Sequence, residues 1–205
     1  MVVTGQLETS QDDSQILHPS SRALFRFWEA MRAERAAPHR AQLDLRRIGG
    51  LVPDLFILEP DGPRRSFRWR LAGTKICELF RCELTGKDFF AGWDAFERET
   101  MRRLLDGVVV KLQPAVFRLR LHTSPDQVVG AEMLALPLRP RNGAGIQVFG
   151  GCFPFRDISG LRHDVVIARE MAGARVIWTE PLPGDRLASD GAGLRAFKLI
   201  RGGLS

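Results

Sequence analysis

The apolar residues change period inside residues 66–90, and this change limits the possible folds more than any other feature of the chain. Over residues 66–72 apolar and basic side chains alternate, which predicts a β-strand with one apolar face. The alternation stops at Gly73, where a glycine permits a sharp turn. The apolar face of the predicted strand carries Phe67, Trp69 and Leu71, and the other face carries Arg68 and Arg70.

A short helix is predicted directly after this turn. Thr74 is a suitable N-cap, and apolar residues then recur at helical spacing as far as Phe80. A second break at residues 84–87 leads into the aromatic pair Phe89 and Phe90. Short helical segments that fold back over their own sheet form a concave, half-apolar surface, which can hold a ligand or a partner.

The remaining pattern predicts an α+β domain. A helix over residues 20–36, capped by Ser20 or Ser21, comes first, and a longer helix runs from Trp93 to Gly107. We expect one five-stranded antiparallel sheet with helices on one face and an N-terminal flanking helix. The strands are predicted at residues 54–59, 66–72, 114–122, 128–138 and 145–153.

The pattern divides the chain into three parts. Residues 1–18 are polar and aperiodic, so we expect a flexible tail. Residues 19–157 carry the domain, and residues 158–205 form a C-terminal extension of unknown role. Within that extension, residues 164–171 and 175–178 fit a helix or a strand equally well.

Composition favours a folded protein in a reducing compartment. The chain has 205 residues, of which 44% are hydrophobic and 26% charged, so it can bury one sizeable core. No apolar run approaches the roughly 20 residues that span a membrane, and the first residues show no secretory signal. Three cysteines, Cys77, Cys82 and Cys152, are an odd number without a disulfide framework, which favours a cytoplasmic location.

The chain is basic, with a net charge of +6 and a pI of about 10.0. Arginine supplies most of the positive charge, and this bias has two interpretations: GC-rich coding, or a surface for nucleic acid or another acidic partner. The basic residues are scattered along the sequence. Nucleic-acid binding is therefore the less favoured alternative.

No arrangement of residues predicts a catalytic or metal site. Cys77 and Cys82 do not share a helix face and have no second pair, so four zinc ligands are lacking. Glu132 and His122 could form an acid–base pair across strands, but a carboxylate that faces Arg118 or Arg120 is the commoner arrangement. A small-molecule enzyme is the least favoured class, because no acid, base and nucleophile cluster together.

The predicted interior is rich in aromatic residues, and two interpretations of it stay open. Either the core is filled, or part of it lines a small cavity, since apolar pockets with few polar groups are the usual ligand sites. In the second case Thr74, Cys77 and Arg81 are the nearest polar contacts. The candidate ligand-binding residues are Trp69, Leu71, Thr74, Cys77, Phe80, Arg81, Phe90, Trp93, Phe117, Leu119 and Met133.

The order of the elements resembles a PAS domain. The sequences RLAGTKICELF and LTG at residues 70–86, followed by LPLRP and GCFP, are similar to a bacterial family of small, mostly single-domain PAS proteins. The resemblance covers residues 20–155. One departure lies after Phe80, where Arg81 and Cys82 stand in place of an expected glycine, so ligand identity does not transfer.

The resemblance implies a sensory or regulatory role without intrinsic catalysis, with an unidentified signalling partner that supplies the output. PAS-like folds can hold haem or flavin, but here a lone His122 at a strand end is more often a solvated or hydrogen-bonded residue. Cys77 is followed by Glu78 rather than by the arginine of the flavin-binding motif. The cofactor is therefore unknown.

The predicted N-terminal helix is apolar over about 160° of its circumference, which is more than one sheet face needs. Such a surface is too apolar to stay exposed on a monomer. We expect either a homodimer, in which Trp28 and Phe25 contribute, or a lid formed by residues 165–200. The candidate interface residues are Leu24, Phe25, Phe27, Trp28 and Met31.

Overall fold

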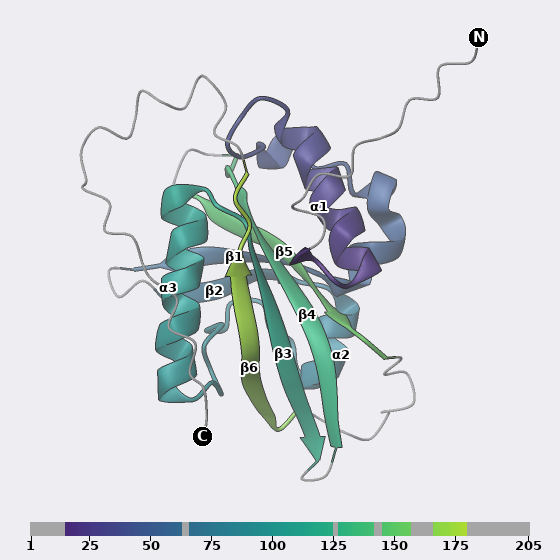
Figure 1. Cartoon of the computed structure of the whole chain (residues 1–205), viewed down its shortest axis with the longest axis vertical. Helices are drawn as coiled ribbons and strands as arrows, with labels where there is room; N and C mark the ends of the chain where they lie inside the picture. The colour runs from purple at the N-terminus through teal and green to yellow at the C-terminus, as the bar shows by residue number, and fades with distance from the viewer. Residues whose placement is uncertain (1–14, 63–65, 125–126, 142–144, 157–165, 180–205) are drawn as a thin grey trace.

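One antiparallel sheet of six strands organises the protein (Figure 1). The computed structural model describes residues 15–62, 66–124, 127–141, 145–156 and 166–179. The strand order is β2-β1-β5-β4-β3-β6. The strands are β1 (Leu55–Asp61), β2 (Ser66–Ala72), β3 (Ala115–Ser124), β4 (Gln127–Leu138), β5 (Gln147–Pro154) and β6 (Ala168–Val176).

Helices cover both faces of this sheet. The helices α2 (Thr74–Phe80) and α3 (Ala95–Lys111) pack on one face, which we call the helical face. The helix α1 (Pro19–Arg32) lies on the other, the α1 face, as Figure 1 shows. The 3-10 helices η2 (Arg40–Gln42) and η3 (Leu45–Asp54) follow α1 in the chain, and apolar side chains of η3 pack against the α1-face core.

The α+β fold and all five predicted strands are confirmed, and one strand is added. Strand β6 pairs antiparallel with β3 and extends the sheet by one strand. Its sequence, AREMAGARV, has small residues at its centre and no clean alternation, so the sequence left helix and strand open there. The second half of β4 is buried on both faces, as its continuous apolar run predicts.

Several helix boundaries differ from the predicted ones. The imidazole of His18 caps α1 by accepting the N–H of Ser20, and the helix ends at Arg32. Gly73, not Thr74, is the N-cap of α2. Helix α3 continues through Gly107 to Lys111, because side chains on either side of the glycine are buried and hold the helix together.

Gly73 is required by close approach and not by an unusual backbone angle. Its φ is −67°, which any residue adopts. A Cβ at this position would lie 2.2 Å from the carbonyl oxygen of Pro53, closer than two such atoms can come. The turn after β2 therefore packs directly on the backbone of η3.

The apolar stripe of α1 is fully covered within the chain. Its five predicted interface residues are at most 7% exposed, and Trp28 is 0% exposed. The indole Nε1 of Trp28 donates to the carbonyl of Pro137 on β4 at 2.8 Å. The expectation that one sheet face leaves part of the stripe exposed is therefore wrong. Side chains of strands β1, β4 and β5, of residues 43–51 and of Ile177 pack against it. These five side chains lie inside the monomer and are not available as an interface.

The folded region begins before residue 19, because a buried carboxylate fixes the chain there. Glu132 on β4 is 0% exposed and accepts the backbone N–H groups of Leu17 and His18 at 3.0 and 2.9 Å. Ile16 is 0% exposed. Residues 1–14 of the predicted tail lie outside the described residues, as do residues 180–205 of the predicted extension and lid.

A β-bulge between β1 and β2 turns Leu71 to the face opposite to that predicted. Leu58 pairs with Trp69 and Ile57 pairs with Leu71, so Arg70 is the extra residue of the bulge. One inserted residue reverses the faces of all that follow. Trp69 thus faces the helical side, as predicted, whereas Leu71 lies beside Ile57 on the α1 face.

Candidate functional site

The helical face gathers most of the predicted ligand-binding residues in one cluster. Trp69 contacts Phe56 edge-on at 5.7 Å between ring centroids, and contacts Phe89 at 5.2 Å. Phe90 and Trp93 continue this aromatic layer. Eight of the eleven predicted residues belong to the cluster or pack against it: Trp69, Cys77, Phe80, Phe90, Trp93, Phe117, Leu119 and Met133.

One side of this cluster keeps accessible surface. Phe80, Cys77, Cys82 and Cys152 pack against it but are only partly buried. Burial and, to a smaller extent, the field of Asp54 raise the pKa of the Cys152 thiol to about 12, and Arg169 opposes both effects. The thiol is therefore neutral at physiological pH and acts as a small apolar group.

Arg169 closes this side of the cluster. Its guanidinium carbon lies 5.0 Å from the ring centroid of Phe80 and 5.2 Å from that of Trp93, and it donates a hydrogen bond to the carbonyl of Ala91. Desolvation lowers its pKa to about 10, while the two aromatic faces favour the charged form. The side chain therefore joins strand β6 to the segment between α2 and α3.

A buried donor in the same region has no partner among the described residues. The indole Nε1 of Trp93 forms no hydrogen bond with the part of the chain that the structure describes, although Trp93 is 5% exposed. An unsatisfied buried donor costs about 1–3 kcal/mol. Such a group is available to a ligand that offers an acceptor.

Three predicted residues lie away from this cluster. Leu71 and Thr74 line a groove on the α1 face, and Leu71 turns toward it because of the bulge at Arg70. Arg81 is exposed and caps α2 in the left-handed conformation, with φ of 48°. The glycine expected at this position has a physical reason, since glycine adopts positive φ without strain.

His122 and Glu132 do not form an acid–base pair. Glu132 lies opposite Arg118 in the sheet, as the alternative interpretation expects, but its oxygens bind the backbone before α1. His122 Nε2 instead lies 3.4 Å from Glu170 on β6, which also pairs with Arg120. Within the described ranges no three His, Cys, Asp or Glu residues are placed to hold a metal ion.

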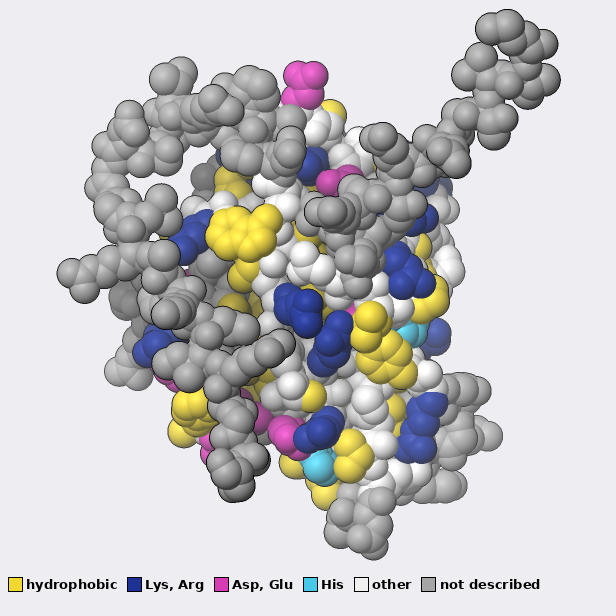
Figure 2. Space-filling model, in the orientation of Figure 1, with side chains coloured by type: hydrophobic (Ala, Val, Ile, Leu, Met, Phe, Trp, Pro, Cys, Tyr) yellow, Lys and Arg dark blue, Asp and Glu magenta, His cyan; other side chains and the backbone are white. Residues whose placement is uncertain are grey.

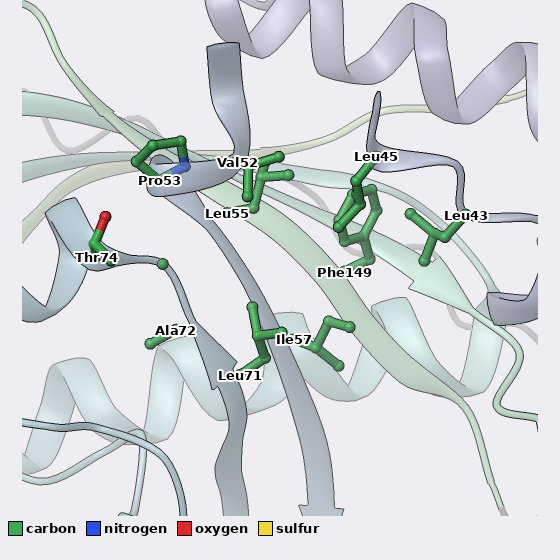
Figure 3. A pocket seen from close by; sticks show the side chains of 11 residues that line it. Leu43, Leu45, Val52, Pro53, Leu55, Ile57, Leu71, Ala72, Thr74 and Phe149 are labelled. Carbon is green, nitrogen blue, oxygen red and sulfur yellow. The ribbon is translucent and has the colours of Figure 1, made fainter. Parts of the chain in front are cut away.

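The α1 face contains a groove with an apolar inner end of about 250 Å³ (Figure 3). Figure 3 shows Ile57 and Leu71 side by side on neighbouring strands, with Leu43, Leu45 and Phe149 toward one end and Pro53 and Thr74 toward the other. The side chain of Leu71 is 37% exposed. No local pattern in the sequence predicts this groove, because it depends on the bulge and on the path of the connector after α1.

The outer end of the groove is lined by both polar and apolar side chains and has a volume of about 740 Å³. It shares Leu43, Leu45, Ile57 and Leu71 with the inner end. The backbone N–H of Arg40 donates to the carbonyl of Arg139 at 2.7 Å, which holds η2 at the end of β4. The polar lining residues are Arg40, Glu59, Arg70, Arg141 and Gln147.

Basic side chains elsewhere do not form one dense patch on the face that Figure 2 shows, where Lys and Arg are spread among other side chains. Several pair with carboxylates, as Arg102 does with Glu99 at 2.7 Å and Arg120 with Glu170 at 2.9 Å. No described helix is long and apolar enough to cross a membrane.

Comparison with known families gives one decisive result. The family model described as PAS domain matches residues 16–153, which is more than half of the chain. This chain belongs to the PAS domain family. The match begins at Ile16, directly before the two residues whose N–H groups Glu132 accepts, and ends at Phe153 on β5. No curated protein and no solved structure matches the sequence.

Strand β6 and Arg169 lie outside the matched part of the PAS domain. The family therefore does not account for the side chain that closes the helical-face cluster. Local sequence does not place it either, because the residues around Arg169 fit a helix or a strand equally well and do not indicate pairing with β3.

Proposed function

We propose that this PAS domain is a non-catalytic sensory or regulatory module in bacterial signalling. It binds a small molecule on the helical face and passes the change to a protein partner. The observation that carries the proposal is the position of Arg169, which joins β6 to the α2–α3 segment through Phe80 and Trp93. A ligand that displaces this segment acts directly on the C-terminal strand.

The ligand contacts follow from two polar groups at this side of the cluster, of which only Trp93 Nε1 lacks a partner among the described residues. Trp93 Nε1 offers an N–H, and the guanidinium of Arg169 offers positive charge beside it. Cys77, Phe80 and Cys152 supply the apolar wall. We therefore infer a mostly apolar ligand with at least one acceptor oxygen, since few polar groups in an apolar site fix a ligand's orientation.

The domain responds to the ligand because the ligand binds its two conformations with different affinities. A ligand shifts an equilibrium between two conformations only if it binds one more tightly than the other. Here the two conformations differ in whether the guanidinium of Arg169 stays between the two rings. A homodimer and a cytoplasmic location remain predictions, and a dimer must use surfaces other than the buried stripe of α1.

Native mass spectrometry of the freshly purified protein, together with its absorption spectrum, tests this proposal. We expect a bound small molecule that is released on denaturation and that slows hydrogen exchange of β6. Trp93→Phe keeps an aromatic six-membered ring and removes the donor together with the rest of the pyrrole ring, so it should weaken binding of that molecule about tenfold. Arg98→Ala on the exposed side of α3 is the matched control.

The proposal fails if the purified protein holds no molecule and if no compound in a metabolite panel changes its melting temperature. It also fails if the bound molecule leaves exchange in β6 unchanged. A steep fall of DNA affinity with salt concentration would instead favour the nucleic-acid alternative.

A further inference from the structure

The groove on the α1 face is separated from the helical face by the full thickness of the sheet. Its inner end is walled by aliphatic side chains and Phe149, and its outer end carries arginines. We propose that this groove binds an amphipathic anion, a short acyl or alkyl chain that ends in a carboxylate or phosphate. This site is additional to the proposed sensory function and does not rest on it.

The inner end fits an alkyl chain. Its volume of about 250 Å³ holds about eight groups of the size of a water molecule or a methylene, at about 30 Å³ each. Leu71 and Val52 are 37% and 36% exposed there, which is unusual for large apolar side chains that line one hollow. An alkyl chain that lies on Ile57 and Leu71 removes their exposed apolar surface from water.

The outer end fits an anionic head group. Arg40, Arg70 and Arg141 line it, against a single carboxylate, Glu59, among its described lining residues. Glu59 lies 3.9 Å from Arg70. Arg40 and Arg141 form no ion pair with any part of the chain that the structure describes. Within the described residues the positive charge at this end is therefore only partly neutralised, and guanidinium groups match carboxylate and phosphate oxygens.

A buried amide gives an independent indication of a ligand. Gln147 lines the outer end, is 6% exposed, and its Oε1 has no hydrogen-bond partner among the described residues. Buried amides are nearly always hydrogen-bonded. A head group at this end, or a water that it holds, supplies the missing partner. Gln147 pairs with Leu138 across β4 and β5, so its position is fixed by the sheet.

Calorimetric titration with four probes that share a decyl chain tests the proposal. The probes are decanoate, decyl phosphate, decanol and decyltrimethylammonium. We expect the two anions to bind, the neutral probe to bind about tenfold more weakly, and the cation not to bind. Among shorter carboxylates, affinity should rise about fourfold for each added methylene until the inner end is filled. The comparison of the two anions decides between carboxylate and phosphate.

Two variants locate the binding. Arg141→Ala should weaken anion binding about tenfold, and Leu71→Asp, which places a carboxylate on the half-exposed floor, should abolish it. Arg98→Ala removes an exposed arginine on the other side of the sheet and should leave the affinity unchanged. Methyl resonances of Ile57 and Leu71 should shift on titration of the parent protein.

The proposal is overturned if none of the four probes binds, if decanol binds as tightly as decanoate, or if Leu71→Asp binds normally while folded. Shifts of Ile57 and Leu71 on dilution without a probe would show that a second copy fills the groove. If Trp93→Phe weakens anion binding and Leu71→Asp does not, the anion binds on the helical face, and the assignment to this groove is overturned.

Discussion

Leu71 lies opposite Ile57 across the β1–β2 pair, on the face of the sheet that Trp69, two residues earlier, does not share. The bulge at Arg70 produces this reversal. As a result β2 contributes apolar side chains to both faces of the sheet. Trp69 packs in the aromatic core of the helical face, and Leu71 forms the floor of the groove.

The two residues should therefore differ strongly in their contribution to stability. Trp69→Ala should lower the free energy of unfolding by about 3–5 kcal/mol, because Trp69 is 4% exposed within a ring cluster. Leu71→Ala should cost about 1 kcal/mol, because Leu71 is half-exposed. Urea denaturation measures both values, and equal losses would mean that the bulge is absent.

Local patterns predicted the strands but not the faces they present after Arg70. Alternation identifies a strand from its residues alone, whereas a bulge depends on the pairing of β2 with β1. The same holds for β6, whose register is fixed by β3 and not by its own small residues. Arg169, Glu132 and Gln147 act through contacts distant in sequence, so no local pattern could place them.

Gly73 provides a test of the packing between the β2–α2 turn and η3. Gly73→Ala should destabilise the protein by about 2–3 kcal/mol, because its Cβ would meet backbone atoms of Pro53 that cannot move independently. Gly107→Ala is the matched control. Apart from neighbouring residues and the backbone of the helix itself, no atom lies within 4 Å of a Cβ there, so this helix position should gain about 0.5–1 kcal/mol. Thermal and chemical denaturation should rank the two variants on opposite sides of the parent.

Ala33 ends α1 in a conformation that L-residues rarely adopt. Its φ and ψ are 48° and −118°, and its side chain is exposed. Ala33→Gly removes this strain without loss of buried surface, so we expect a gain of about 1 kcal/mol. An unchanged or lower denaturation midpoint would contradict the positive φ at this position.

The Cys152 thiol should make stability fall at alkaline pH. Its pKa is 9.0 in the unfolded chain and about 12 in the folded protein, so only the unfolded state loses the proton between these values. The free energy of unfolding should therefore decrease as pH rises from 9 toward 12, by at most about 1.4 kcal/mol per pH unit. Cys152→Ala should remove this part of the slope.

Alkylation provides a second measurement on the same group. At pH 8.5 iodoacetamide should modify Cys152 slowly in the folded protein and rapidly in denaturant, as peptide mass spectrometry can follow. Equal rates in both states would show that the thiol ionises normally in the folded protein.

Substitutions of Trp28 test whether its ring is buried within one chain or lies at an interface between two copies. Its ring is 0% exposed, and its Nε1 donates to Pro137 on β4. Trp28→Glu should therefore prevent folding and not release a folded monomer, because it buries an unpaired charge. Trp28→Phe keeps an apolar aromatic ring but loses the hydrogen bond and the volume of the pyrrole ring, so it should fold with a loss of about 2 kcal/mol. Light scattering should give the same mass for Trp28→Phe as for the parent protein at equal concentration, whether that mass is a monomer or a dimer. A folded, monomeric Trp28→Glu variant of a dimeric parent would instead place this ring between two copies of the chain.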